Sequence, residues 1–249
     1  MDSSDSSTFY DADTANRYDD ELRSDEDVAA TFLQELAAGG PALEFAIGTG
    51  RIAIPLIERG VEVHGIELSP HMVEHLRAKP SGANVPVTVG DMSAVRAPGS
   101  FPLVYLVYNT IFNLLTQDDQ VSCFVNAARH LSQDGVFLVE TAVPSAWTDQ
   151  HSYVRPEKIG PDSVALDVVR YDAATQLFEE NHVRLSQAGI QFGPIMCRLI
   201  WPAEMDLMAR IAGLTLLDRW GGWHREPFTG QSTMHVSVYG RVAPDAEAK

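Results

Sequence analysis

The first 140 residues alternate between short apolar runs and segments in which apolar residues recur with helical period. Apolar runs at 43–47, 61–68, 85–89, 103–108 and 136–140 predict five strands. Helical spacing follows after residue 51, over 70–77 and over 120–131. Strands that alternate with helices predict a parallel sheet with helices packed against it.

The pattern changes to simple alternation between residues 144 and 200. Three passes, over 164–171, 177–185 and 190–200, are separated by turn residues, which predicts an antiparallel meander. A helix over 203–212, ended by Gly213, and two strands over 214–219 and 233–239 complete the pattern. We therefore expect an acidic arm at 1–27, a core at 28–143, an insertion at 144–200, the end of the core at 201–243 and a tail at 244–249.

The first predicted strand runs into a glycine turn. Residues 43–50 read Leu-Glu-Phe-Ala-Ile-Gly-Thr-Gly, and a turn this sharp needs glycine because a Cβ excludes positive φ or close approach to a ligand. Glu44 at this strand suits a cofactor that carries positive charge. The same residues allow another interpretation, since Gly48, Gly50 and Ala53 also match the dinucleotide fingerprint G-x-G-x-x-A, with an acid, Glu67, 19 residues after Gly48.

Polar residues also follow the next strands. Glu67 ends the second strand, where a carboxylate can accept from both hydroxyls of a ribose, and Ser69-Pro70 then begins a helix. Gly90-Asp91-Met92 closes the third strand, where an acid can accept from an adenine amino group. Asn109-Thr110 follows the fourth strand.

In these signals, taken in this order, the chain resembles the class I S-adenosylmethionine-dependent methyltransferases, in particular bacterial enzymes that modify sugars and secondary metabolites. The resemblance implies a Rossmann-like α/β fold: a mostly parallel seven-stranded sheet with helices on both faces and a small antiparallel β insertion. It implies that Glu44 and the Gly48–Gly50 backbone hold the methionine part of S-adenosylmethionine, Glu67 the ribose, Asp91 the adenine amine, and that Met92 flanks the ring. The full set expected around the cofactor, whose product is S-adenosylhomocysteine, is Tyr18, Glu44, Gly48, Thr49, Gly50, Glu67, Leu68, Asp91, Met92 and Tyr108.

Composition narrows the class of partner. The chain has 249 residues and a formal net charge of −16, a sign that repels phosphate backbones, so we expect no nucleic-acid substrate. No apolar run reaches the roughly 18 to 20 residues that span a bilayer, and the start, Met-Asp-Ser-Ser-Asp, lacks the features of a signal peptide, so we expect a cytoplasmic protein without membrane contact. No Cys or His spacing suggests a metal site.

The segments that the cofactor fold does not require supply the acceptor candidates. The insertion is interpreted as an acceptor lid or as a sheet used for dimer contacts, and the loop 220–228 as a structural corner or an acceptor contact. The arm is either a solvated tail or a cover over the cofactor. We expect acceptor contacts from Tyr10, Asn109, Asn113, Trp147, His151, Trp201 and Trp223, and catalytic roles for Tyr153, His182 and His224.

The function expected from this resemblance is metal-free transfer of a methyl group from S-adenosylmethionine to a small-molecule acceptor. The attacking atom is a nitrogen, an oxygen or an electron-rich carbon, and secondary metabolism is the expected setting. Two alternatives stay open: an NAD-dependent oxidoreductase on the same glycine turn, and a non-catalytic relative that binds the cofactor. A homodimer is compatible with either interpretation of the insertion.

Overall fold

A computed structural model of the chain describes residue 19, residues 24–148 and residues 150–241. Seven strands form one sheet, in the order β10-β11-β5-β4-β1-β2-β3. In this sheet only β11 runs antiparallel to its neighbours. The strands are β1 (Ala42–Phe45), β2 (Val63–Glu67), β3 (Val87–Val89), β4 (Phe101–Leu106), β5 (Leu131–Ala142), β10 (Leu214–Trp220) and β11 (Met234–Arg241). The predicted Rossmann-like sheet is confirmed.

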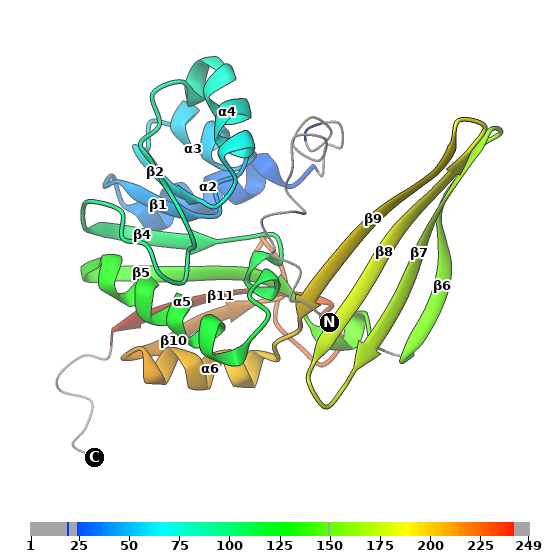
Figure 1. The fold of residues 1–249 in the computed structure, drawn as a ribbon. Coiled ribbons are helices and arrows are strands. Elements are labelled where there is room, and N and C mark those ends of the chain that lie inside the picture. The colour runs from blue at the N-terminus through cyan, green and yellow to red at the C-terminus, as the bar shows by residue number, and fades with distance from the viewer. Residues whose placement is uncertain (1–18, 20–23, 149, 242–249) are drawn as a thin grey trace.

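Helices cover both faces of this sheet (Figure 1). One buried cluster joins the sheet to α5 and α6, and the other joins it to α2, α3 and α4. Along β4, Val104 belongs to the first cluster and Tyr105 to the second, as the alternation of side chains across a strand requires. The helices are α2 (Glu26–Ala37), α3 (Ala53–Glu58), α4 (Pro70–Ala78), α5 (Gln117–His130) and α6 (Pro202–Ile211), with 3₁₀ turns η2 (Pro80–Gly82), η3 (Thr110–Asn113) and η4 (Pro144–Ala146).

The predicted helix start at Ser69-Pro70 is confirmed in detail. The Ser69 side chain accepts a hydrogen bond from the Met72 N–H at 3.4 Å, and Pro70 occupies the first turn, where its missing N–H costs nothing. This cap places α4 directly after Glu67, at the carboxyl end of β2.

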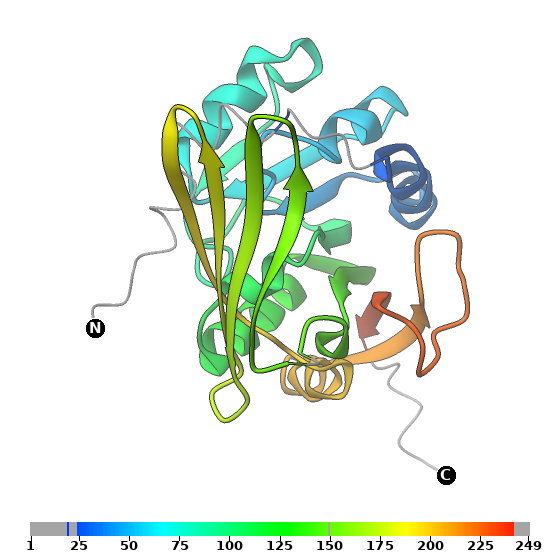
Figure 2. The same cartoon turned by 90° about the vertical axis from the view of Figure 1, so that its right-hand side faces the viewer.

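A second sheet, the meander, consists of β6 (Ser152–Ile159), β7 (Ser163–Asp172), β8 (Leu177–Ser186) and β9 (Gly189–Arg198) in sequential order. It stands beside the carboxyl ends of the parallel strands, and the view in Figure 2 shows it in front of the core. The sequence predicted three passes, and β6 was missed. Pro156 and the charged residues around it hide the alternation, and proline is tolerated here because β6 is an edge strand.

The base of the meander is fixed to the core. Arg198, at the end of β9 and 6% exposed, donates hydrogen bonds to Gln120 on α5, to Gln176 and to Glu204 on α6. Phe178 at the start of β8 is 2% exposed, and its ring centroid lies 5.6 Å from that of Trp147. By contrast, Ile159, Ile190 and Phe192 toward the other end are 61% to 75% exposed. Among the described residues, the contacts that anchor the meander to the core therefore lie at one end of it.

None of the described helices combines the length and the apolar character needed to span a membrane.

Candidate functional site

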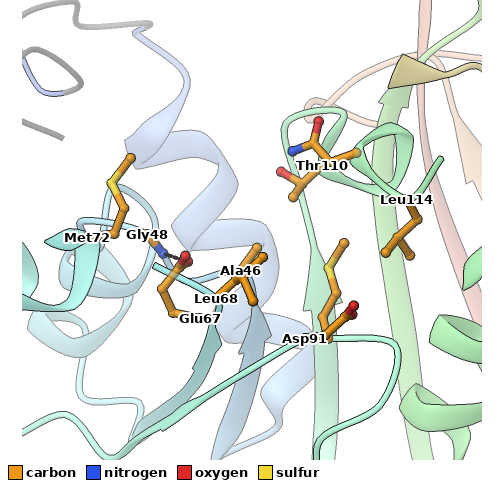
Figure 3. Close-up of a pocket in the computed structure, with 10 residues that line it drawn as sticks. Ala46, Gly48, Glu67, Leu68, Met72, Asp91, Thr110 and Leu114 are labelled. Carbon is orange, nitrogen blue, oxygen red and sulfur yellow. Dashed lines mark hydrogen bonds between the residues drawn. The ribbon is translucent and has the colours of Figure 1, made fainter. Parts of the chain in front are cut away.

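A cleft that is partly open to solvent lies where β1, β2, β3 and β4 end (Figure 3). Strand order reverses between β1 and β4, and ligands of open α/β sheets bind outside the carboxyl ends of the strands at such a point. The residues lining the cleft are Ala46, Gly48, Glu67, Leu68, Met72, Asp91, Met92, Thr110, Asn113 and Leu114.

The glycine turn and Glu67 form one wall of this cleft. Glu67 Oε2 accepts from the Gly48 N–H and Oε1 from the Ser69 N–H, both at 2.8 Å. The carboxylate is 5% exposed, and burial raises its pKa, although these backbone bonds oppose the shift. Gly48 and Gly50 have φ of 57° and 85°, and a Cβ on Gly50 would lie 2.5 Å from Leu76 Cδ1. The turn therefore requires glycine at both positions.

Glu44 lies in the sheet behind the turn rather than on the surface of the cleft. It is 3% exposed, and its Oε2 accepts from the hydroxyl of Tyr105 at 2.9 Å. Burial raises the pKa of Glu44 to about 8, against the opposing effects of the Tyr105 bond, of Arg51 and of the Ala53 N–H. Because the Ala53 N–H begins α3, Glu44 supports the turn and helix from below.

The end of β3 contributes the wall opposite Gly48 (Figure 3). Asp91 and Met92 line the cleft, as does Leu68, which is 38% exposed. Asp91 Oδ1 accepts from both the N–H and the hydroxyl of Ser93 at 2.7 Å, so this carboxylate is held in place while the rest of it stays open to solvent.

Two of the predicted tyrosines, Tyr10 and Tyr18, lie outside the described residues. The neighbouring Asp19 is described: its carboxylate accepts from Thr49 Oγ1 at 2.7 Å and pairs with Lys79 Nζ at 2.7 Å. Lys79 also donates to the Thr49 carbonyl at 2.8 Å. The predicted Thr49 therefore connects the glycine turn to the chain that precedes α2.

A corner after β4 brings Tyr108 and Asn109 to the same edge of the sheet. The Arg51 guanidinium, which pairs with Asp25 on one side, lies 5.0 Å from the centroid of the Tyr108 ring. Asn113, a short distance further along, lines the cleft, and its Oδ1 lies 3.9 Å from Cys197 Sγ on β9. Asn113 thus joins the cleft to the meander.

Four other predicted residues lie in β6 or in the segments that connect the meander to the core. Trp147 packs edge-on against Phe112 and also contacts Phe178, and Tyr153 is partly buried against the same cluster. His151 is exposed, as is Trp201, which precedes α6 and is 40% exposed. The structure brings Trp147 and Tyr153 into contact with the core, and leaves His151 and Trp201 at the surface.

The partner of His182, Asp167, was not predicted from the sequence. Asp167 on β7 is opposite His182 on β8, and the Asp167 Oδ1 to His182 Nδ1 distance is 2.8 Å. Arg155 on β6 donates to the other oxygen of Asp167 at 2.9 Å, and Glu180 Oε2 lies 3.8 Å from His182 Nε2. Asp167 is 2% exposed, so both partners are needed to offset the burial of its charge.

Glu157, Asp167 and His182 also place potential metal-ligand atoms within 4.8 Å of one another. Sequence spacing did not reveal this set, because its members come from three strands. The Arg155 guanidinium on Asp167 already supplies the positive charge that an ion would bring.

Trp223 and His224 lie elsewhere. Trp223 is 7% exposed and packs edge-on against Phe32 of α2, with ring centroids 5.6 Å apart, in the cluster on the α2 side of the sheet. His224 is exposed, and its N–H donates to Glu226 at 3.0 Å. The structure does not bring these two residues to the lining of the cleft.

The residues present fit S-adenosylmethionine. Gly48 and Gly50 have the positive φ of a tight glycine turn, an acid ends β2, and a second acid, Asp91, follows β3 in the same cleft. Glu67 and Asp91, which the resemblance assigned to ribose and adenine, lie in one cleft as that assignment requires.

Comparisons with known proteins agree with this site. A family model described as a methyltransferase domain matches residues 42–135. The structure of the CcbJ methyltransferase from Streptomyces caelestis is similar, with 35% identity, a TM-score of 0.90, and coverage of 96% of this chain and 100% of that one.

Two further proteins extend the comparison. The cypemycin N-terminal methyltransferase of a Streptomyces species is 27% identical over 209 residues, 82% of this chain and 84% of that protein. The fold also matches S-adenosylmethionine-bound CalS10, an amino pentose methyltransferase from Micromonospora echinaspora, with 20% identity, a TM-score of 0.70, and coverage of 94% and 98%.

Proposed function

Because the chain belongs to the class I S-adenosylmethionine-dependent methyltransferases, we propose that it methylates an amino group of a small molecule in a biosynthetic pathway. Its cofactor is S-adenosylmethionine, as the resemblance implied, and the family decides against the dinucleotide interpretation of the glycine turn. Two of the similar proteins act, by their names, on an N-terminus and on an amino pentose, which supports nitrogen as the attacking atom.

The observation that carries this proposal is the arrangement of His182 between two carboxylates. Asp167 and Glu180 place negative charge on either side of its ring. Nε2 of His182 and Oε2 of Glu180 are 3.8 Å apart, so one ammonium group, which has three N–H donors, can reach both. A hydroxyl offers a single donor and no charge, and it gains less from this surrounding.

The chemistry of an amine makes such a group useful. The cofactor supplies an electrophilic methyl group, and an amine attacks it only as the neutral form. In this proposal His182 Nδ1–H donates a hydrogen bond to Asp167, and Nε2 is therefore the nitrogen that can accept a proton. His182 then removes a proton from the ammonium, and the resulting imidazolium is stabilised by Asp167 and Glu180.

The remaining predicted residues divide between the two ligands in this proposal. Gly48, Thr49, Gly50, Glu67, Leu68, Asp91, Met92 and Tyr108 contact the cofactor, while Glu44 supports the turn. Asn109, Asn113, Trp147 and Tyr153 face the acceptor, with Trp147 and Tyr153 forming an apolar wall. Alignment of the attacking nitrogen with the methyl group can lower the activation barrier by on the order of 7 to 11 kcal/mol.

Paired acceptors test the choice of nitrogen. We would incubate the protein and S-adenosylmethionine with D-glucosamine or D-glucose, and with a dipeptide amide whose N-terminus is free or acetylated. Formation of S-adenosylhomocysteine and the mass of the product are measured against a reaction without acceptor. Methylation of the amine in either pair, with its neutral counterpart inert, is the expected result. Equal methylation of the neutral counterparts, or no methylation of either amine, contradicts the proposal.

A further inference from the structure

The chain leaves β4 through a corner of unusual backbone conformation. Tyr108 and Asn109 have φ of 58° and 60°, so two consecutive residues with side chains occupy the left-handed region. Bulky residues rarely adopt this region, and such strain persists only where the surrounding structure enforces it. The corner lies at the carboxyl end of a central strand, immediately before Thr110, which lines the cleft.

The end of β5 enforces the corner. Glu140 Oε2 accepts from the Tyr108 N–H at 2.5 Å, and the Glu140 carbonyl accepts from the Asn109 N–H at 3.3 Å. Asn109 Oδ1 in turn accepts from Thr141 Oγ1 at 3.0 Å and from the Ala142 N–H at 2.6 Å. Glu140 is 7% exposed, so its carboxylate is committed to this arrangement at a considerable cost in desolvation.

These bonds also fix the direction of the Asn109 amide. The Thr141 hydroxyl and the Ala142 N–H both donate to the oxygen of this amide. Because a backbone N–H can only donate, the atom that faces Ala142 must be the amide oxygen. The NH₂ end of the amide therefore points away from the end of β5. The other side of the corner is held by Arg51, which follows the glycine turn and lies over the Tyr108 ring. The corner is thus clamped between the cofactor turn and β5.

We propose that Glu140 is a positioning residue for methyl transfer, because it locks the Tyr108–Asn109 corner so that the Asn109 amide orients the acceptor at the end of the cleft. This inference rests on the proposed function of the same site. Glu140 acts through the corner and does not itself touch the reacting atoms. Glu140 was not predicted from the sequence, because its partners Tyr108 and Asn109 lie more than 30 residues earlier and no pattern links them to a single acid at the end of a strand.

The first experiment uses turnover and cofactor affinity together. A misplacement of about 1 Å can cost roughly 100-fold in rate, so Glu140→Ala should lower kcat for the best amine of the panel by about that factor. Its Kd for S-adenosylhomocysteine, measured by calorimetry, should stay within about threefold of the original because Glu67 and Gly48 are untouched. Glu140→Gln keeps an oxygen that can accept from Tyr108, and it should restore most of kcat.

A second pair of variants separates positioning from stability. Asn109→Asp keeps an oxygen that accepts from Thr141 and Ala142 and tolerates the left-handed conformation, but it removes the NH₂ group, so its Tm should stay close to that of the original chain while kcat falls. Glu62→Ala, on the exposed segment before β2, is the matched control for loss of a glutamate and should leave kcat unchanged.

A spectroscopic measurement needs no turnover. With S-adenosylhomocysteine bound, the side-chain amide resonances of Asn109 are followed by NMR while the amine of the panel with the highest turnover is added. They should move in the original chain and in Glu140→Gln but not in Glu140→Ala. No movement in the original chain, or equal movement in Glu140→Ala, overturns the inference.

The outcomes distinguish this inference from the proposed function. If the amines are methylated and Glu140→Ala keeps its kcat, the role of Glu140 is wrong and the proposed function stands. If Glu140→Ala lowers kcat, Tm and cofactor affinity together and Glu140→Gln restores none of them, Glu140 is structural only. If hydroxyl compounds are methylated instead of amines, the proposed function falls, and the Glu140 variants are compared on that hydroxyl substrate with the same expected result.

Discussion

The buried carboxylate of the cleft, Glu67, is held by backbone N–H groups, whereas the buried carboxylate of the meander, Asp167, is held by other side chains that can carry charge. Glu67 accepts from the N–H groups of Gly48 and Ser69, which follow the carboxyl ends of β1 and β2. Asp167 accepts from Arg155 and contacts His182, which come from neighbouring strands. The first arrangement depends on the local course of the chain, and the second on cross-strand register.

This difference has a functional consequence. A carboxylate fixed by backbone donors keeps its position whichever ligand is present, which suits a cofactor that is always the same. A carboxylate fixed by side chains can exchange partners when a cationic ligand arrives, which suits an acceptor site whose specificity varies between relatives.

The strongest test of the cleft side is Glu67→Ala. Its loss removes a charged acceptor from two buried N–H groups and from the cofactor, and hydrogen bonds to charged groups contribute about 1.5 to 3 kcal/mol each. We expect the affinity for S-adenosylmethionine to fall by about 2 to 3 kcal/mol, or roughly 30- to 150-fold, by calorimetry. An unchanged Kd would remove Glu67 from the cofactor site.

Glu44 gives a test through pH. Its raised pKa, about 8, means that the folded protein binds this proton more tightly than the unfolded chain, for which the reference value is 4.5. The resulting stability is present below the unfolded value and is lost as pH rises through about 8. Between pH 6 and 8 the original chain should lose roughly 2 kcal/mol more than Glu44→Gln in urea unfolding. Parallel pH profiles for the two proteins would show that Glu44 is ionised in both states.

On the meander side, His182→Asn keeps a donor near the position of Nδ1 but removes Nε2. Methylation of the amine substrate should fall by about tenfold, or 1.4 kcal/mol in the barrier, with the cofactor Kd unchanged. The deficit should shrink as pH approaches the ammonium pKa of the acceptor itself, because neutral amine then needs no base. His75→Asn on α4 serves as the control. A deficit that is independent of pH would argue for a packing role.

Asp91→Ala should have the smallest effect. One of its oxygens already accepts two bonds from Ser93, so the mutation removes a single contact to the adenine amine on a solvent-exposed carboxylate. We expect a loss of about 1 kcal/mol, roughly fivefold, for both S-adenosylmethionine and S-adenosylhomocysteine. Equal binding by the variant and the original chain would place the adenine elsewhere in the cleft.

The same contrast explains what sequence patterns predict here. Gly48, Gly50, Glu67 and Asp91 are recognisable because each stands at the end of a strand whose apolar run is visible, and parallel strands bring their ends together. The pairing of Asp167 with His182 depends on a register between β7 and β8 that alternation alone does not fix. The preceding strand β6 is obscured by Pro156, and Arg155 with it.

The loop after β10 shows a second limit. Two tryptophans and a histidine in a glycine-rich segment suggest a binding loop, and either a corner or an acceptor contact was open. Phe32, against which Trp223 packs, is 191 residues earlier in the chain, on a helix whose apolar face also requires a partner. The Tyr108–Asn109 corner was likewise not predicted, because glycine is the strongest signal of left-handed backbone; asparagine adopts this region more readily than most residues, but tyrosine rarely does.

The anchoring of the meander at the end near Phe178 and Arg198 predicts a gradient of amide hydrogen exchange along it. Near Phe178 and Arg198 the backbone is covered by the core, so exchange there requires opening of the whole fold, whereas the backbone near Ile190 and Phe192 is exposed and needs only local fraying. Protection factors should therefore decline steadily from one end of β8 and β9 to the other. An acceptor bound against His182 would raise protection from the middle outward, and the exchange pattern would then trace the footprint of the ligand on the sheet.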